Sequence, residues 1–209
     1  MLETVLRMAA GEIERAAPER PIIKVAGICG PVEQAMRETE LALKYGYHLG
    51  LVSNGGLESL SELDLLKRTE KISERIPVFG FYLQPAVGGR LLSYDFWKDF
   101  AEIPNVHAIK VAPFDRYLTL DVVRAVCYSS RRDDIALYTG NDDHIVLDLL
   151  TTYRFEAEGE TVEKDFVGGL LGHWAFWTEQ AVAYFERIKQ VKSERAPIPP
   201  DLLQLDVAV

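Results

Sequence analysis

The sequence predicts an α/β protein in which six parallel strands alternate with helices. Six short, nearly continuous apolar runs recur along the 209 residues, at 22–27, 47–53, 78–82, 106–112, 135–138 and 167–174. Both faces of each run are apolar, which is typical of strands buried in a parallel sheet. Their starts lie 25 to 32 residues apart, which is the spacing of one strand followed by one crossover helix.

The segments between the runs carry signals of helix ends. Residues 3–19 are expected to form a helix ahead of the first strand. Pro31 opens the next helix and Gly46 closes it, in keeping with the preference for proline at the first turn and glycine beyond the last. Ser61 and Asp64 resemble a capping box. The predicted N-caps of the later helices are Ser93, Thr119, Asn141 and Thr178.

Composition favours one globular domain. Apolar residues make up 48% of the chain and charged residues 26%, which is enough for a sizeable core and argues against disorder. Residues 1–195 are predicted to form the domain, and a C-terminal tail over 196–209 begins in a proline-rich stretch. The net charge of −9 argues against binding to nucleic acid or to an anionic membrane, because phosphate neutralisation needs clustered lysine and arginine.

The remaining composition bears on the compartment. Two cysteines, Cys29 and Cys127, are too few for a disulfide framework and favour a reducing environment. The first twenty residues hold four glutamates and no continuous apolar run, unlike a signal peptide. The uncharged stretch that begins at Phe166 is shorter than the roughly 20 residues that cross a bilayer. We therefore expect a cytoplasmic protein without membrane contact.

Enzymes with parallel sheets carry their chemistry at the carboxyl ends of the strands. Lys110 lies inside an apolar strand, where burial would lower its pKa and make the neutral amine available for Schiff-base chemistry. The alternative is an ordinary strand lysine that reaches the rim, as Lys24 is expected to do. Tyr82 ends another strand and could relay protons to an imine. The alternative, a core aromatic with its hydroxyl at the rim, is the better interpretation of this residue taken alone.

Other residue types do not form a recognisable site. The four histidines show no ligand spacing, so no metal is expected. The glycines match neither a dinucleotide fingerprint nor a P-loop, so no nucleotide cofactor is expected. The strand period alone leaves two architectures open: an open doubly wound sheet, or part of an eight-stranded barrel. A closed barrel needs roughly 250 residues, and this chain is two strands short of one.

Several motifs resemble the dihydrodipicolinate synthase and N-acetylneuraminate lyase family of class I, Schiff-base aldolases. In that family a strand-end tyrosine in a Y-x-x-P setting precedes the imine-forming lysine of an I-K pair by one strand-helix unit. The sequence reproduces both elements, in Tyr82 to Pro85 and in Ile109-Lys110. Residues 21–27 look like the family's third strand, residues 140–143 like its glycine-acid turn after the seventh, and residues 168–173 like its eighth.

The resemblance implies an incomplete (β/α) barrel of the TIM type, with six units corresponding to strands three to eight. It implies that Lys110 forms a Schiff base with a 2-oxo acid, pyruvate above all, and that Tyr82 moves protons. Both side chains should then point into the barrel lumen. The expected substrate-binding residues are Gly140, Asn141, Asp142 and His173. The resemblance implies no metal, no organic cofactor and a homo-oligomer.

Departures from the family support a competing hypothesis. The second-strand loop that holds the substrate carboxylate has no counterpart in residues 1–21, and Val87 stands where the synthases carry a carboxylate-binding arginine. The alternative is a non-catalytic, truncated homologue that only binds or associates; an open nucleotide-binding sheet is disfavoured because no phosphate-binding glycine loop is present. Open edges beside 22–27 and 167–174 should be covered by another subunit, the N-terminal helix or the tail.

Overall fold

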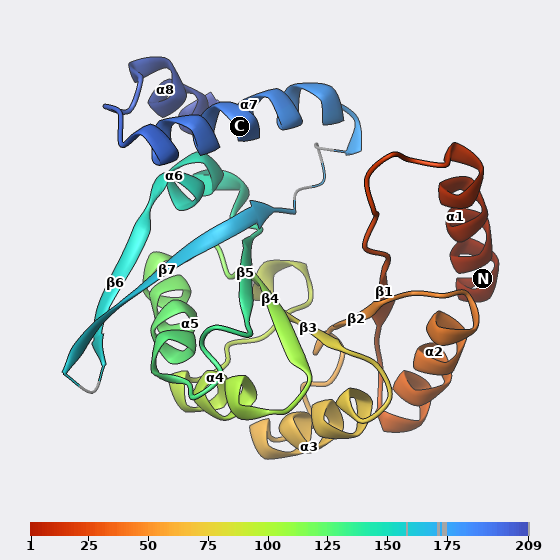
Figure 1. The fold of residues 1–209 in the computed structure, drawn as a ribbon. Helices are drawn as coiled ribbons and strands as arrows, with labels where there is room; N and C mark the ends of the chain where they lie inside the picture. The colour runs from red at the N-terminus through yellow and green to blue at the C-terminus, as the bar shows by residue number, and fades with distance from the viewer. Residues whose placement is uncertain (158, 171, 173–174, 209) are drawn as a thin grey trace.

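The computed structural model describes residues 1–157, 159–170, 172 and 175–208. Strands and helices alternate as the sequence predicts (Figure 1). The strands are β1 (Val25–Ile28), β2 (Leu49–Val52), β3 (Val78–Leu83), β4 (Val106–Ala112), β5 (Ala136–Thr139), β6 (Thr152–Ala157) and β7 (Glu160–Gly169). The helices are α1 (Leu2–Ala16), α2 (Val32–Lys44), α3 (Glu62–Ser73), α4 (Tyr94–Glu102), α5 (Arg116–Tyr128), α6 (Ile145–Leu150), α7 (Thr178–Glu194) and α8 (Pro200–Ala208), with 3-10 turns η1 (Pro85–Val87) and η2 (Asp142–His144).

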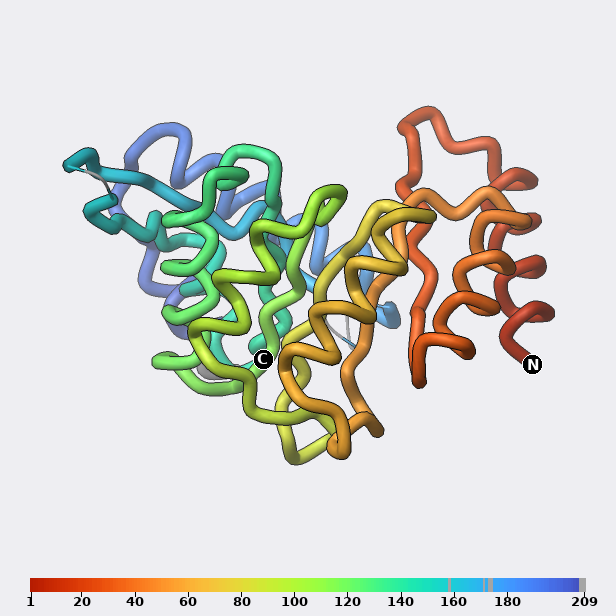
Figure 2. The backbone as a smooth tube through the Cα atoms, turned by 90° about the horizontal axis from the view of Figure 1, so that it is seen from below, coloured from red at the N-terminus to blue at the C-terminus, as the bar shows by residue number. Residues whose placement is uncertain are grey.

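The strands form one curved sheet in the order β1-β2-β3-β4-β5-β7-β6. The five pairings from β1 to β5 and on to β7 are parallel, and β6 pairs with β7 antiparallel. Helices α2 to α5 lie around the outside of the curve, as Figures 1 and 2 both show. The fold is an incomplete TIM-type barrel, which decides between the two architectures that the strand period left open.

The two faces of the sheet have different surroundings. The outward layer packs beneath the helices and includes Val78, Ile109, Val111 and Trp97, each at most 1% exposed. Gly80 leaves room there for α4, because a Cβ on it would lie 2.7 Å from the Phe100 ring. Neighbouring strand residues alternate to the opposite face. That inner face, which we call the lumen, is where the site must be sought.

The β6–β7 hairpin is the one strand pair that the sequence analysis did not predict. Its two ladders use different halves of β7: residues 160–165 pair with β6, and residues 166–169 pair with β5. The signal is period-two alternation in β6, where Tyr153 is buried and Arg154 is exposed. The turn between the strands includes Gly159 at φ 83°. The polar residues of this segment hid the strands from a search for continuous apolar runs.

The predicted caps of α3 and α4 are confirmed, and the three predicted for later helices are wrong. Ser61 and Asp64 form the capping box of α3, and Ser93 caps α4. Thr119 does not cap α5, because the helix begins three residues earlier and Asp115 accepts a hydrogen bond from the amide of Leu118. Thr178 is the first residue of α7 rather than its cap. The η2 turn follows Asn141, whose side chain makes no capping bond.

The two ends of the chain pack against helices. At the N-terminus, α1 lies beside α2 in both views (Figures 1 and 2), and Tyr47 donates its hydroxyl hydrogen to the Leu6 carbonyl. At the C-terminus the segment expected as a tail forms α8. The Asp206 carboxylate accepts hydrogen bonds from the amides of Val146 and Leu147 at the start of α6. No described helix is both long and apolar enough to cross a membrane.

Two edges of the parallel sheet remain open. Within the part of the chain that the structure describes, no strand pairs with the outer side of β1 or with the outer side of residues 166–169. The helix α1 packs mainly on α2, and α8 packs on α6, so neither replaces a strand. The first half of β7 is covered by β6. For the two open edges, coverage by a second subunit remains a prediction.

Candidate functional site

Lys110 lies on the lumen face of β4. In register it sits beside Phe81 on β3 and Tyr138 on β5, while its chain neighbours Ile109 and Val111 face the helices. The Lys110 Nζ atom is 4.6 Å from the centre of the Phe81 ring. Burial lowers the pKa of the Lys110 ammonium, and the charge of Asp142 opposes this shift. The lumen-facing lysine and the direction of its pKa shift agree with the sequence expectation.

Gly140 makes space for the lysine. A Cβ atom at this position would lie 2.7 Å from Lys110 Cε and 3.0 Å from Ala112 Cβ. The Gly140 amide also donates to the Val111 carbonyl at 2.8 Å, which joins the end of β5 to β4. A second close approach lies below it, where a Cβ on Gly168 would be 3.0 Å from the Tyr138 ring. Two glycines, Gly140 and Gly168, therefore leave space for side chains on the lumen face around Lys110.

Tyr82 lies on the wrong face for the predicted proton relay. It is fully buried and pairs in register with Val111, and its ring is 5.1 Å from that of Trp97 on α4. Its hydroxyl donates to the Leu92 carbonyl and accepts from the Leu92 amide, both at 3.3 Å. The expectation that Tyr82 and Lys110 both point into the lumen is wrong for Tyr82. Alternation along β3 gives the lumen position to Phe81 instead.

The predicted substrate-binding residues after β5 divide into two groups. Asp142 is half-buried and its charge acts on Lys110. Asn141 is 1% exposed, and protein partners engage its whole amide: Oδ1 accepts from the Phe114 amide, and Nδ2 donates to Thr119 and Asp148. Its side chain therefore holds the turn rather than facing the lumen. His173 lies outside the described residues.

A buried polar cluster behind this turn was missed. Asp148 on α6 is fully buried, and each of its oxygens accepts two hydrogen bonds. Arg116 and Tyr153 donate to Oδ1 at 2.5 and 2.8 Å, and Thr139 and Asn141 donate to Oδ2 at 2.6 and 3.0 Å. A lone acid within the apolar stretch 145–150 is the signal that could have drawn attention to it, since buried carboxylates need partners.

A second buried charge lies at the other end of the sheet. Arg68 on α3 is fully buried; its Nε donates to the Gly30 carbonyl at 2.7 Å, and its NH1 to Asn54 Oδ1 at 3.5 Å. The buried NH2 has no hydrogen-bond partner. Burial lowers the pKa of the guanidinium, and the charges of Cys29 and Glu38 oppose the shift. Asn54 and Phe81 both line a small cavity of about 10 Å³.

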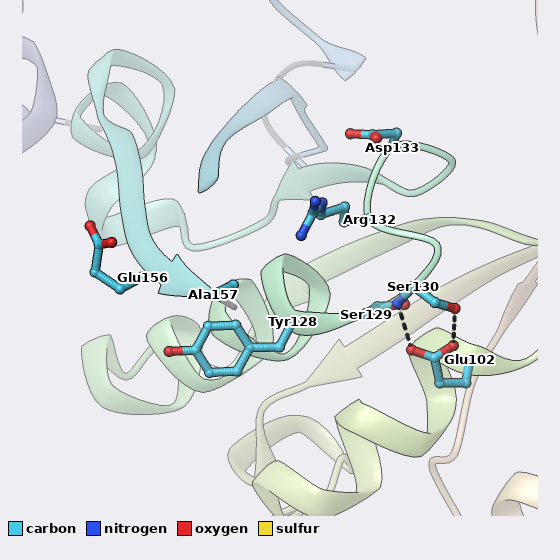
Figure 3. A pocket seen from close by; sticks show the side chains of 8 residues that line it. All are labelled: Glu102, Tyr128, Ser129, Ser130, Arg132, Asp133, Glu156 and Ala157. Carbon is cyan, nitrogen blue, oxygen red and sulfur yellow. Dashed lines mark hydrogen bonds between the residues drawn. The ribbon is translucent and has the colours of Figure 1, made fainter. Parts of the chain in front are cut away.

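Figure 3 shows a cavity whose lining does not include Lys110. It has a volume of about 760 Å³, and its lining includes Tyr128, Arg132 and Glu156. Four of its lining residues lie just before β5, namely Ser129, Ser130, Arg132 and Asp133. The cavity therefore opens at the amino ends of the strands, whereas Lys110 lies toward the carboxyl end of β4. Figure 3 also shows Ser130 bonded to Glu102. Within the described residues, no group of three histidines, cysteines or acids is arranged to hold a metal.

Comparisons with known proteins give a fold and no sequence family. No protein-family model matches the sequence, and no curated protein matches it. Solved structures do match. Dihydrodipicolinate synthase from Bacillus clausii superposes with a TM-score of 0.71 at 16% identity, covering 100% of this chain and 61% of its own. The enzyme from Acinetobacter baumannii, complexed with pyruvate, gives a TM-score of 0.67 at 20% identity, covering 92% and 63%.

A lyase gives the same result. N-acetylneuraminate lyase from Fusobacterium nucleatum superposes with a TM-score of 0.72 at 14% identity, covering 98% of this chain and 60% of its own. The chain thus spans less than two thirds of the length of these structures. Their barrels match the six parallel strands and outer helices described above, and the expected fold is confirmed. In fold, this chain is similar to dihydrodipicolinate synthases and N-acetylneuraminate lyase.

Proposed function

We propose that Lys110 forms a Schiff base with a 2-oxo acid, pyruvate above all, as in a class I aldolase-type lyase. The observation that carries the proposal is a half-buried lumen amine with a lowered pKa, seated against Gly140. The neutral amine would attack the ketone carbon, and the resulting carbinolamine would lose water to give an imine. That imine would withdraw electrons while a carbon-carbon bond forms or breaks. No metal or organic cofactor is needed for these steps.

Two observations support the choice of substrate class. The fold is similar to that of synthases and lyases, one of which was solved in complex with pyruvate. Gly140 packs against Lys110 and the charge of Asp142 acts on its amine, and we propose these two residues as the mouth of the substrate site; Asn141 would support that mouth from behind. Tyr82 would act by holding Leu92, because its hydroxyl is bonded on the helix side of the sheet.

Borohydride trapping tests the proposal. Incubation with pyruvate and borohydride should leave a reduced adduct on the peptide that contains Lys110, and Lys110→Ala should remove it. Lys164 is the matched control, because burial also lowers its pKa while its ammonium donates to the Arg132 carbonyl at the amino ends of the strands. Equal labelling of Lys164, or labelling that persists in Lys110→Ala, would show that lysines react nonspecifically, and would contradict a substrate site at Lys110.

A binding-only protein is the second candidate. The chain spans about 60% of the solved neighbours, and two sheet edges are open in its described part. This candidate predicts an adduct on Lys110, or none, without turnover of any 2-oxo acid. Measuring adduct formation and carbon-carbon bond cleavage on the same sample separates the two candidates. A homo-oligomer would cover the open edges, and sedimentation of the same sample tests that proposal.

A further inference from the structure

The Asp148 carboxylate fixes the segment that leads from β5 to the candidate site. Its Oδ2 accepts from the hydroxyl of Thr139, the last residue of β5, and from the side chain of Asn141. The Thr139 hydroxyl also accepts from the Asn141 amide at 3.2 Å. Residues 139 and 141 are thus held from the helix side by a single buried oxygen.

The same cluster reaches the strand that carries Lys110. Asn141 Oδ1 accepts from the amide of Phe114, which follows β4 and has a φ of 55°. Asn141 Nδ2 also donates to Thr119 of α5 at 3.1 Å. The ends of β4 and β5 therefore have one shared anchor, and a displacement of Asp148 would change the spacing between them.

Gly140 and Asp142 flank Asn141; Gly140 packs against the Lys110 side chain, and Asp142 acts on it through its charge. The Asp142 charge favours the ammonium form of Lys110. The other neighbours of Lys110 on the lumen face are Phe81 of β3 and Tyr138 of β5. On the lumen face of the described parts of β3 and β5, Tyr138 is the other titratable side chain. Asp142, in the turn after β5, is the charged residue that acts on the amine.

We propose that Asp148 is a positioning residue for Lys110: through Thr139 and Asn141 it fixes the turn that seats Gly140 against the lysine side chain and carries Asp142, and so controls the reactivity of the amine. A neutral amine reacts with acetic anhydride whatever its natural substrate is. The inference therefore rests on the proposed function only for the identity of that substrate. Oδ1 of Asp148, which Arg116 and Tyr153 occupy, faces the other side of the cluster and supplies a control.

The test measures the titration of Lys110 in the full chain without pyruvate. Trace acetylation with acetic anhydride across pH, read peptide by peptide by mass spectrometry, reports the midpoint at which each lysine becomes reactive. Removing the Asp142 charge in Asp142→Asn should move the Lys110 midpoint down by roughly half a pH unit or more. Thr139→Val and Asp148→Asn should move it in the same direction.

Non-additivity identifies the route. Because Asp148 is proposed to act on the midpoint through the turn that carries Asp142, the double variant Asp142→Asn/Thr139→Val should show the midpoint of Asp142→Asn alone. Tyr153→Phe removes one bond to Oδ1, so it should lower the melting temperature and leave the Lys110 midpoint unchanged. The Lys24 midpoint serves as the internal reference in every sample.

Three results overturn the proposal: an unchanged midpoint in Asp142→Asn, an unchanged midpoint in Thr139→Val, or an equal shift in Tyr153→Phe. Thr139→Val decides the question if Asp148→Asn fails to fold. Borohydride trapping with pyruvate is run on the same proteins. A failed adduct together with the expected midpoints would reject the 2-oxo acid and retain the positioning role, whereas an adduct with unchanged midpoints would do the opposite.

Discussion

Two fully buried charges lie at opposite ends of the sheet, and their surroundings differ. Asp148, behind β5, accepts four hydrogen bonds, including those from the ends of β5 and its turn. Arg68, behind β1 and β2, binds one carbonyl closely and one amide at 3.5 Å, and its NH2 has no partner. Both oxygens of the Asp148 carboxylate, which lies behind Lys110, have their hydrogen bonds filled, whereas one nitrogen of Arg68, near an open edge, has no partner. The NH2 of Arg116 within the Asp148 cluster is also buried without a partner, so the difference lies in the hydrogen bonds that the carboxylate itself accepts.

Removing Asp148 should have the largest effect on stability. Asp148→Ala leaves three buried neutral donors and the partly exposed Arg116 without their acceptor, and each buried polar group left unpaired typically costs about 1–3 kcal/mol. The free energy of unfolding from urea titration gives the loss. A loss below about 1 kcal/mol would show that Asp148 contributes no more to stability than an exposed ion pair does, and would contradict the contrast with Arg68.

Gly140→Ala should come next, with its main effect on chemistry. The added Cβ would meet Lys110 Cε at 2.7 Å and Ala112 at 3.0 Å, and such overpacking typically costs about 1–3 kcal/mol. The trapping rate with pyruvate should fall because the lysine is displaced. Gly27→Ala is the matched control on the lumen face, since nothing lies within 4 Å of its added Cβ. Equal rates in the two variants would contradict the placement of Lys110 against Gly140.

Tyr82→Phe should have a smaller effect, confined to stability. The variant removes the hydroxyl that bonds both backbone groups of Leu92, and leaving a buried polar group unpaired typically costs about 1–3 kcal/mol. Thermal unfolding measures this loss, and pyruvate trapping on Lys110 should keep nearly the wild-type rate. A rate decrease of about 100-fold or more would restore Tyr82 as the proton relay.

Arg68→Met should have the smallest effect. The substitution removes a buried charge that has an unpaired NH2 and keeps an apolar stem of similar length, and such replacements are often neutral. We expect the free energy of unfolding to change by less than about 1 kcal/mol. Urea titration beside Asp148→Ala gives the comparison directly, and a loss as large as that of Asp148→Ala would show that Arg68 has partners equal to those of the carboxylate.

The sequence by itself determined the order of the parallel strands and the position of the lysine. Continuous apolar runs mark the parallel strands because both of their faces are covered, and the run around Lys110 matches β4 residue for residue. The serine caps of α3 and α4 were readable because capping is local and involves residues three apart. Gly140 was also identified from its motif, and the structure adds the close approach that requires it.

Tertiary structure decided which face each side chain takes and which polar groups meet. A shift of one residue in register moves a strand side chain to the other face, and this put Phe81 in the lumen and Tyr82 beneath α4. The partners of Asp148 come from α5, β5, the following turn and β6, so no local pattern could bring them together. Local propensity fixes the elements, but contacts between residues distant in sequence exist only after the sheet has closed around them.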